Sequence, residues 1–216
     1  FQDYFKNKIL ATKWLTIMNG IDDIFLSDNS LQSKKLIGHK LSVVYAGNIG
    51  IAQALDKIIP GLALLNPNMQ FIVIGEGSGR KILEAAIENK IFSNIEILNP
   101  MPRSELLQFY RDANILFLHL KDIPAFQRVL PSKIFEYGSM NKPILAGVSG
   151  FMATFLNENF SNAYVFNPEN LEYANKMLNN ALARDQENNF YINFTEKFSR
   201  DFLLDQYSHE IKKLLI

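Results

Sequence analysis

The 216-residue chain contains no cysteine, only three histidines and no excess of either charge. Without cysteine it can form neither a disulfide nor a thiolate metal site. Basic and acidic residues both number 22, so the chain lacks the cationic excess that is typical of nucleic-acid-binding domains. It also has no apolar run of about 18 residues, and we therefore expect no membrane-spanning helix.

Hydrophobic residues make up 48% of the chain, enough for the core of one large domain. From residue 41 onward, short apolar runs alternate with helical patterns. Continuous apolar strands between helices predict a parallel sheet covered on both faces, which is a Rossmann-like doubly wound α/β fold with C-terminal helices. We predict strands over residues 41–47, 70–75, 94–98, 113–118, 143–146 and 163–166. We predict helices over 51–66, broken at Pro60-Gly61, over 79–90, over 103–111, from 132 and through 169–216. Before residue 41 we expect a short strand over 14–18, a tight turn at 19–22 and a polar linker over 27–40.

Residues 131–147 form the most informative stretch, because they combine a helix start with a charged pattern. Pro131 suits a first helical turn, Ser132 is expected to cap the free amides, and Lys133 adds a positive charge beside them. A helix N-terminus next to a cation suits a phosphate. Glu136 follows one turn later on the same face, where its carboxylate can accept hydrogen bonds from ribose hydroxyls. This pattern predicts a site for a nucleoside diphosphate.

The expected topology brings further residues to the same place. In a sheet of order 3-2-1-4-5-6, ligands bind beyond the carboxyl ends of the first and fourth strands. The first strand ends in a glycine turn at Gly47, Asn48 and Gly50, which can bring backbone close to a ligand. The fourth ends at His119, which either points into the crevice or serves as a packed or capping histidine. The histidines at positions 39 and 209 lie in a predicted linker and a terminal helix, and no cluster has metal-ligand spacing.

Residues 75–80, with the sequence Gly-Glu-Gly-Ser-Gly-Arg, suggest a dinucleotide-binding fingerprint after the second strand. The last glycine of that fingerprint is replaced by Arg80, and the motif follows the second strand rather than the first. We therefore do not expect NAD binding. The segment is better interpreted as a loop that lines a base pocket together with Leu98 and Asn99.

Residues 131–147 resemble the donor-binding signature of retaining glycosyltransferases of the GT-B fold, in the large group-4 family; their last part, Asn-Lys-Pro-Ile-Leu-Ala at 141–146, fits the strand of that signature. A second match at residues 19–25, Asn-Gly-Ile-Asp-x-x-Phe, resembles the segment that closes the N-terminal domain of these enzymes. The resemblance implies that residues 1–40 end a missing N-terminal acceptor domain and include a linker. Residues 41–216 then form the nucleotide-sugar donor domain.

The resemblance also implies an activity: metal-independent, retaining transfer of an N-acetylated amino sugar from a UDP-linked donor to a glycan or lipid-linked acceptor, in surface polysaccharide biosynthesis. The chain by itself is then expected to be inactive, and no cofactor other than the donor is expected. Such an enzyme works in the cytoplasm or at the inner face of the cell membrane. Arg128 and Lys133 are expected to stabilise the leaving diphosphate. Position 128 often holds glutamate in the family, and the cationic pair common after the glycine turn is missing from residues 51–57.

Two other functions stay open. The chain could be a non-catalytic nucleotide-sugar binding module, which fits if the natural gene also lacks the N-terminal half. It could also be a sugar-nucleotide epimerase, since these share the GT-B architecture, although no convincing set of acid–base residues is visible. An upstream in-frame domain would favour the transferase.

Overall fold

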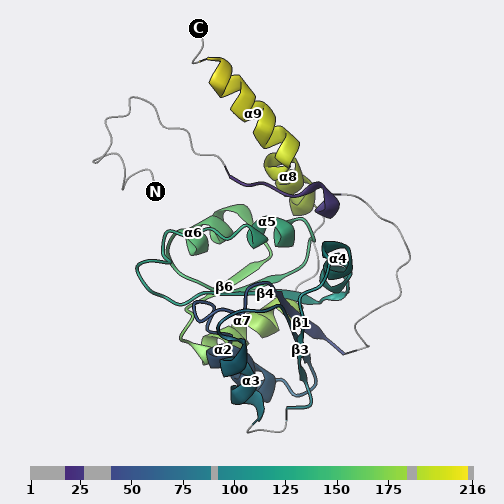
Figure 1. Ribbon diagram of the computed structural model, residues 1–216, viewed down its shortest axis with the longest axis vertical. Coiled ribbons are helices and arrows are strands. Elements are labelled where there is room, and N and C mark those ends of the chain that lie inside the picture. Colours follow the sequence, from purple (N-terminus) through teal and green to yellow (C-terminus); the bar gives the residue numbers. More distant parts are fainter. Residues whose placement is uncertain (1–17, 27–39, 89–91, 184–188, 214–216) are drawn as a thin grey trace.

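The computed structural model describes residues 18–26, 40–88, 92–183 and 189–213. In these ranges the chain forms a six-stranded, all-parallel sheet of order β3-β2-β1-β4-β5-β6 (Figure 1). The strands are β1 (Ser42–Ala46), β2 (Gln70–Ile74), β3 (Ile95–Leu98), β4 (Ile115–His119), β5 (Ile144–Gly147) and β6 (Ala163–Phe166). The order confirms the predicted doubly wound fold. The strand expected over 14–18 and the linker over 27–40 fall almost entirely outside the described residues.

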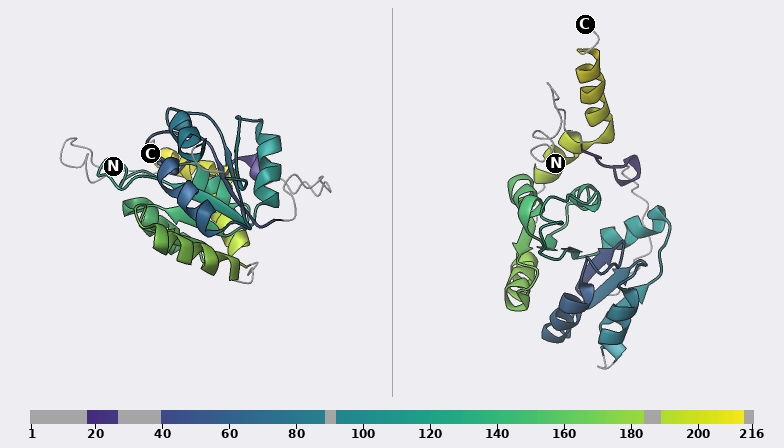
Figure 2. Two further views of the ribbon diagram at one scale, coloured as in Figure 1. Left: turned by 90° about the horizontal axis from the view of Figure 1, so that it is seen from below. Right: turned by 60° about the vertical axis from the view of Figure 1, so that its left-hand side comes forward.

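Helices cover both faces of the sheet (Figures 1 and 2). One face carries α4, α5 and α6, and the opposite face carries α2, α3 and α7. The bounds are η1 (Asp23–Phe25), α2 (Leu55–Leu65), α3 (Arg80–Glu88), α4 (Arg103–Asp112), α5 (Lys133–Gly138), α6 (Gly150–Asn159), α7 (Leu171–Ala183), α8 (Asn189–Phe198) and α9 (Arg200–Lys212).

The sheet separates two hydrophobic cores. Alternate residues of β1 point to opposite sides, so Val44 joins the core under α4, α5 and α6, whereas Val43 joins the core under α2 and α7. Every residue of β1 and of β4 is buried, as expected for strands in the middle of a doubly covered sheet. These two strands pair through Val43–Ile115 and Val44–Leu116, which places their carboxyl ends side by side.

Helix α2 differs from the prediction, because it is continuous through Pro60. A proline inside a helix removes one backbone hydrogen bond, a loss that usually favours a break. Here Ile59 and Leu62, on either side of Pro60, are both buried, and their packing holds the helix together. The helix also begins later than expected, at Leu55. The residues that precede it form a turn that ends at Ala54, whose φ is +46°.

Helix α6 was not predicted between β5 and β6. It follows Ser149, which has an extended backbone, and it buries Met152, Phe155 and Leu156 against the sheet. Apolar residues also occupy exposed positions such as Phe151, so the helical period is weak in the sequence. The structure thus adds a helix that borders the carboxyl end of β5.

The expected tight turn at residues 19–22 is also wrong. Ile21 instead forms a parallel bridge with Ser199, and its N–H donates to the carbonyl of Phe198 at 2.8 Å. Asp22 is extended and pairs with Arg103 and, at 3.6 Å, with Arg200. The segment before η1 therefore runs beside the junction of α8 and α9. From there α9 projects away from the sheet without burying any residue (Figure 2).

The packing of α2 on the sheet leads to a prediction about the free energy of unfolding. Leu62 is fully buried, whereas Leu64 on the same helix is 53% exposed. Leu62→Ala should lower the free energy of unfolding by about 2–5 kcal/mol, because it leaves a cavity in the core. Leu64→Ala is the matched control and should change it by less than about 0.5 kcal/mol. Urea denaturation measures both, and equal effects would show that α2 is not packed on the sheet in this way.

Candidate nucleotide-binding site

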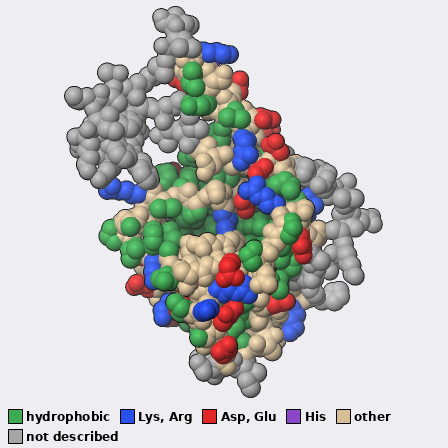
Figure 3. Space-filling model, viewed as in Figure 1, with side chains coloured by type: hydrophobic (Ala, Val, Ile, Leu, Met, Phe, Trp, Pro, Cys, Tyr) green, Lys and Arg blue, Asp and Glu red, His purple; other side chains and the backbone are tan. Residues whose placement is uncertain are grey.

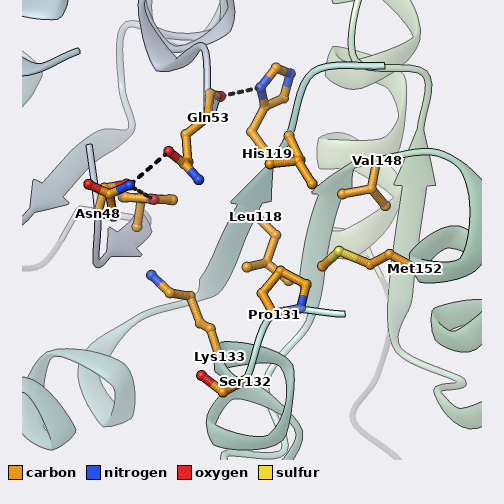
Figure 4. A pocket seen from close by; sticks show the side chains of 11 residues that line it. Asn48, Gln53, Leu118, His119, Pro131, Ser132, Lys133, Val148 and Met152 are labelled. Carbon is orange, nitrogen blue, oxygen red and sulfur yellow. Dashed lines mark hydrogen bonds between the residues drawn. The ribbon is translucent and has the colours of Figure 1, made fainter. Parts of the chain in front are cut away.

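The carboxyl ends of β1, β4 and β5 border a pocket of about 170 Å³ (Figure 4). The start of α5 closes one side of it and the start of α6 another. Six lining residues are polar or aromatic, namely Tyr45, Asn48, Gln53, His119, Ser132 and Lys133. Five are apolar, namely Leu118, Leu120, Pro131, Val148 and Met152. The pocket lies at the predicted crevice, and it gathers four of the predicted site residues: Asn48, His119, Ser132 and Lys133.

Gly47 and Lys133 are in direct contact across this crevice. Gly47 has φ of +137°, a backbone conformation that other residues rarely adopt. A Cβ atom built on it would overlap the amino nitrogen of Lys133. Gly75, at the end of β2, approaches in turn so closely that its Cβ would overlap the carbonyl oxygen of Gly47. Glycine at position 47 is therefore what lets the lysine side chain lie against the end of β1.

The amino nitrogen of Lys133 is buried, and it has no hydrogen-bond partner among the described residues. It lies 4.5 Å from the centre of the Tyr45 ring, a cation–π distance. Burial lowers the pKa of this lysine to about 8, against a smaller opposing effect of the Glu136 carboxylate. A buried ammonium without a hydrogen-bonded partner is unfavourable, and an anionic ligand would relieve that cost. The pocket is thus suited to an anion such as a phosphate.

Glu136 lies on α5 beside a buried pair of tyrosines. Its carboxylate accepts a hydrogen bond from the Tyr110 hydroxyl at 3.3 Å. The Tyr137 hydroxyl accepts from the Ala46 N–H and donates to the Phe117 carbonyl, both at 3.3 Å. Burial raises the pKa of both phenols, so they stay protonated hydrogen-bond donors. Tyr137 thereby fixes α5 to β1 and β4. Glu136 is partly exposed and lies outside the pocket lining.

Side chains on both sides of the predicted glycine turn hold it in place through hydrogen bonds. The Gln53 side-chain oxygen accepts hydrogen bonds from the Gly50 N–H at 3.1 Å and from the Asn48 amide at 3.3 Å. The Tyr45 hydroxyl donates to the Asn48 carbonyl at 2.5 Å. These bonds give the turn one fixed shape next to Lys133. Asn48 lines the pocket, whereas Gly50 does not.

His119 lines the pocket, but both of its ring nitrogens lie within hydrogen-bond distance of backbone carbonyls. Its Nδ1 lies 2.7 Å from the Gln53 carbonyl, and its Nε2 lies 3.1 Å from the Pro168 carbonyl. Burial lowers the pKa of the imidazole, and the two carbonyls oppose this effect. Of the two alternatives, the geometry agrees with a packed, capping histidine. It joins the loop before α2 to the loop after β6.

The start of α5 differs from the prediction in its details. Helix α5 begins at Lys133, so Pro131 lies before the helix rather than in its first turn. Ser132 is already helical (φ −58°, ψ −26°), and its side chain makes no capping hydrogen bond. The hydroxyl cannot reach the amides because a side-chain cap needs an extended backbone at that position. Arg128, in the preceding loop, is exposed and is not part of the pocket lining.

Leu98 ends β3, two strands away from β1, and Asn99 follows it; neither residue lines this pocket. Residues 75–80 do not line the pocket either. Arg80 hydrogen-bonds to nearby side chains, those of Glu76 at 3.1 Å and of Glu84 on α3 at 2.8 Å. The segment nevertheless packs on the glycine turn, because the Ile49 N–H donates to the Glu76 carbonyl at 2.7 Å. The predicted base pocket at these residues remains a prediction.

Sequence reasoning missed several residues of the pocket: Tyr45, Gln53, Leu118, Leu120, Val148 and Met152. Met152 was out of reach because α6 itself was not predicted. Tyr45 could have been found, since it is the one aromatic residue of the first strand and stands two positions before the glycine turn. Its ring turned out to be the surface on which Lys133 rests.

Charges elsewhere are mixed: basic and acidic side chains are interspersed on the face shown in Figure 3. Among the described residues, no group of three or more His, Asp or Glu side chains could hold a metal ion. Likewise, none of the helices in the described ranges is long and apolar enough to cross a membrane.

A doubly wound parallel sheet with a pocket at its topological switch point defines a class of α/β domains in which ligands bind beyond the carboxyl ends of the strands. The comparison with family models narrows this class. The model of the family "Glycosyl transferases group 1" matches residues 27–198, most of the chain. The chain therefore belongs to this glycosyltransferase family, as its sequence signature had indicated. No curated protein gives a significant match.

Solved structures share the fold at low sequence identity. A glycosyltransferase from Rickettsia africae is 16% identical, with a TM-score of 0.74, and the match covers 93% of this chain and 57% of that one. TarM from S. aureus, in a point-mutant form, is 16% identical, with a TM-score of 0.69 over 96% and 41%. HepE from Anabaena is 16% identical, with a TM-score of 0.67 over 80% and 48%. The chain thus spans about half the length of these relatives.

The buried lysine predicts an unusual pH dependence of stability. Between about pH 8 and 10.5 the folded protein has released the Lys133 proton while the unfolded chain still binds it. Stability contributed by this residue therefore rises with pH across that interval. Relative to Lys133→Met, the wild type should gain roughly 2–3 kcal/mol between pH 7.5 and 10.5. Denaturant unfolding at several pH values measures the difference, and Lys57→Met, at an exposed lysine, should show no such slope.

Proposed function

We propose that this chain is the donor-binding part of a glycosyltransferase that uses a UDP-linked sugar. The observation that carries the proposal is the buried amino group of Lys133. It has no hydrogen-bond partner in the part of the chain that the structure describes, and it points into the pocket beside the glycine turn (Figure 4). An ammonium in this position can pair with a diphosphate. Glu136, on the same helix, is available to the ribose hydroxyls. Among the relatives, HepE was solved with UDP and glucose, which is in keeping with a UDP-linked donor.

The chemistry requires charge stabilisation at the leaving group. When the sugar–phosphate bond breaks, negative charge grows on the departing diphosphate and positive charge grows on the sugar ring. Lys133 is fixed before the reaction by its contacts with Tyr45 and Gly47, so it needs little reorganisation to stabilise the diphosphate. Arg128, from the adjoining loop, is proposed to add a second cation. These two residues would replace the cationic pair that residues 51–57 lack, and no divalent metal would be needed.

Three more specific assignments extend this proposal: the donor sugar, the stereochemical outcome and the acceptor. We propose an N-acetylated amino sugar as the donor sugar, retention of its configuration, and a glycan or lipid-linked acceptor of a surface polysaccharide. The TarM mutant was solved with UDP and alpha-GlcNAc-glycerol, so an amino-sugar product has a precedent on this fold. Residues 1–40 are proposed to end an acceptor-binding domain. Turnover would then require a cleft between two domains, and this chain alone would bind the donor without transferring the sugar.

Binding of UDP should need no metal. We expect calorimetry in EDTA to detect UDP binding to this chain, with an affinity that falls above about pH 8 as Lys133 loses its proton in the free protein. Lys133→Met should abolish most of the binding, and Arg128→Met should weaken it less, because Arg128 is exposed. A strict requirement for magnesium or manganese, or unchanged binding by Lys133→Met, would overturn the assignment of the anion site.

The role of Glu136 can be separated from a helix-dipole effect. Glu136→Gln should weaken UDP binding by about 1.5–3 kcal/mol, the worth of hydrogen bonds between ribose and a carboxylate. Glu172→Gln is the matched control, since Glu172 also lies in the first turn of a helix, α7, on the opposite face of the sheet. The control should leave affinity unchanged. Equal small losses of thermal stability in both variants, with no change in affinity, would show that Glu136 serves only the helix dipole.

A further inference from the structure

The pocket has two unlike sides. Figure 4 shows Lys133 and Asn48 on one side and Val148 and Met152 on the other, with Leu118 between them. The apolar side is formed by the end of β4, the residue after β5 and the start of α6. Its side chains are nearly inaccessible even without a ligand, with Met152 1% and Val148 4% exposed. This apolar wall, defined as Leu118, Leu120, Val148 and Met152, is therefore part of the rigid core.

The apolar wall offers a ligand little to hydrogen-bond. None of its four side chains carries a nitrogen or oxygen atom. Two of its backbone donors are also engaged: the Leu120 N–H donates to the Gly147 carbonyl at 2.9 Å, and the Val148 N–H donates to the Phe166 carbonyl at 3.1 Å. A sugar hydroxyl placed here would give up its bond to water without a replacement, which is unfavourable. An apolar group would gain from the same burial.

The position of the wall relative to Lys133 identifies which part of a ligand would reach it. In a nucleotide sugar the diphosphate joins the nucleoside to the sugar. With the diphosphate at Lys133 and the ribose near Glu136, the nucleoside side is directed along α5. The remaining side of the pocket, toward β5 and α6, is left for the sugar. The sugar would then lie between the cation and the apolar wall.

We propose that the apolar wall is a subsite for a methyl-bearing substituent of the donor sugar, with Val148 and Met152 as the residues that determine specificity. This inference rests on the proposed function. The methyl group can belong to an acetamido group or to a 6-deoxy sugar, and both present the same chemistry to the wall. A plain hexose, which carries a hydroxyl in either place, is the disfavoured ligand.

The test compares four ligands on this chain by calorimetry: UDP, a UDP-hexose, its 2-acetamido counterpart and its 6-deoxy counterpart. One methyl-bearing donor should bind at least about fourfold more tightly than the plain hexose, the value of one buried methyl group. Preference for the acetamido donor assigns the wall to an N-acetyl group. Preference for the 6-deoxy donor assigns the wall to the C6 methyl group of the sugar. Either result supports the apolar wall as a methyl-binding subsite.

Val148→Thr supplies the matched variant, since threonine keeps the shape of valine and adds a hydroxyl. It should bring the ratio of methyl-bearing to plain donor close to one. Val165→Thr, on β6 and outside the pocket lining, is the control and should keep the wild-type ratio. Thermal unfolding checks that both variants are folded, and if Val148→Thr is not, the wild-type ratio alone decides.

The binding measurements distinguish failure of the inference from failure of the proposed function. If UDP binds but all three donors bind equally, the apolar wall does not contact the sugar, and the inference is overturned while the proposed function stands. If neither UDP nor any donor binds, the proposed function itself is overturned, and the inference falls with it.

Discussion

The phenol of Tyr137 fixes α5 to the two central strands, and the pocket takes its shape from that attachment. One hydroxyl group bonds to the backbone of β1 at Ala46 and of β4 at Phe117, although the residues lie 91 and 20 positions apart in the chain. Because the helix is held there, Lys133 at its first position lies against Gly47, and Glu136 one turn later accepts a hydrogen bond from Tyr110. The side chain of Lys133 is thus positioned by hydrogen bonds of Tyr137, a residue that lies outside the pocket lining.

The fold was largely predictable from the sequence because its main determinant is local. Strands buried on both faces are continuous apolar runs, and helices with one buried side show their period, so the sheet and its topology could be foreseen. The errors arose where tertiary packing outweighed local preference. The core contacts of Ile59 and Leu62 keep α2 continuous through Pro60, and α6 is helical despite apolar residues on its exposed side. The bridge between Ile21 and Ser199 joins positions too distant for any local pattern to indicate.

For the candidate site, the sequence indicated which residue types come together but not how each is used. Gly47 and Lys133 were identified as neighbours of a phosphate, and the sequence placed the lysine beside a helix end, but it gave no sign of what the amino group would contact. The structure instead has the amino group buried over the Tyr45 ring. His119 was correctly placed at the crevice, but the carbonyls that occupy its nitrogens come from Gln53 and Pro168, on two separate loops. Contacts of this kind depend on the assembled sheet and have no signal in the nearby sequence.

The contact between Gly47 and Lys133 has a consequence for how this protein can vary. The lysine occupies the volume that any side chain at position 47 would need, and the loop at Gly75 takes the space next to it. Alanine at position 47 would push the amino group out of the crevice. A shorter residue at position 133 would remove that clash, but the φ of +137° would still favour glycine at position 47. The two positions therefore form one coupled unit, although they lie far apart in the sequence. Any side chain at position 47 would therefore disturb the place of the amino group as well as the backbone of the turn.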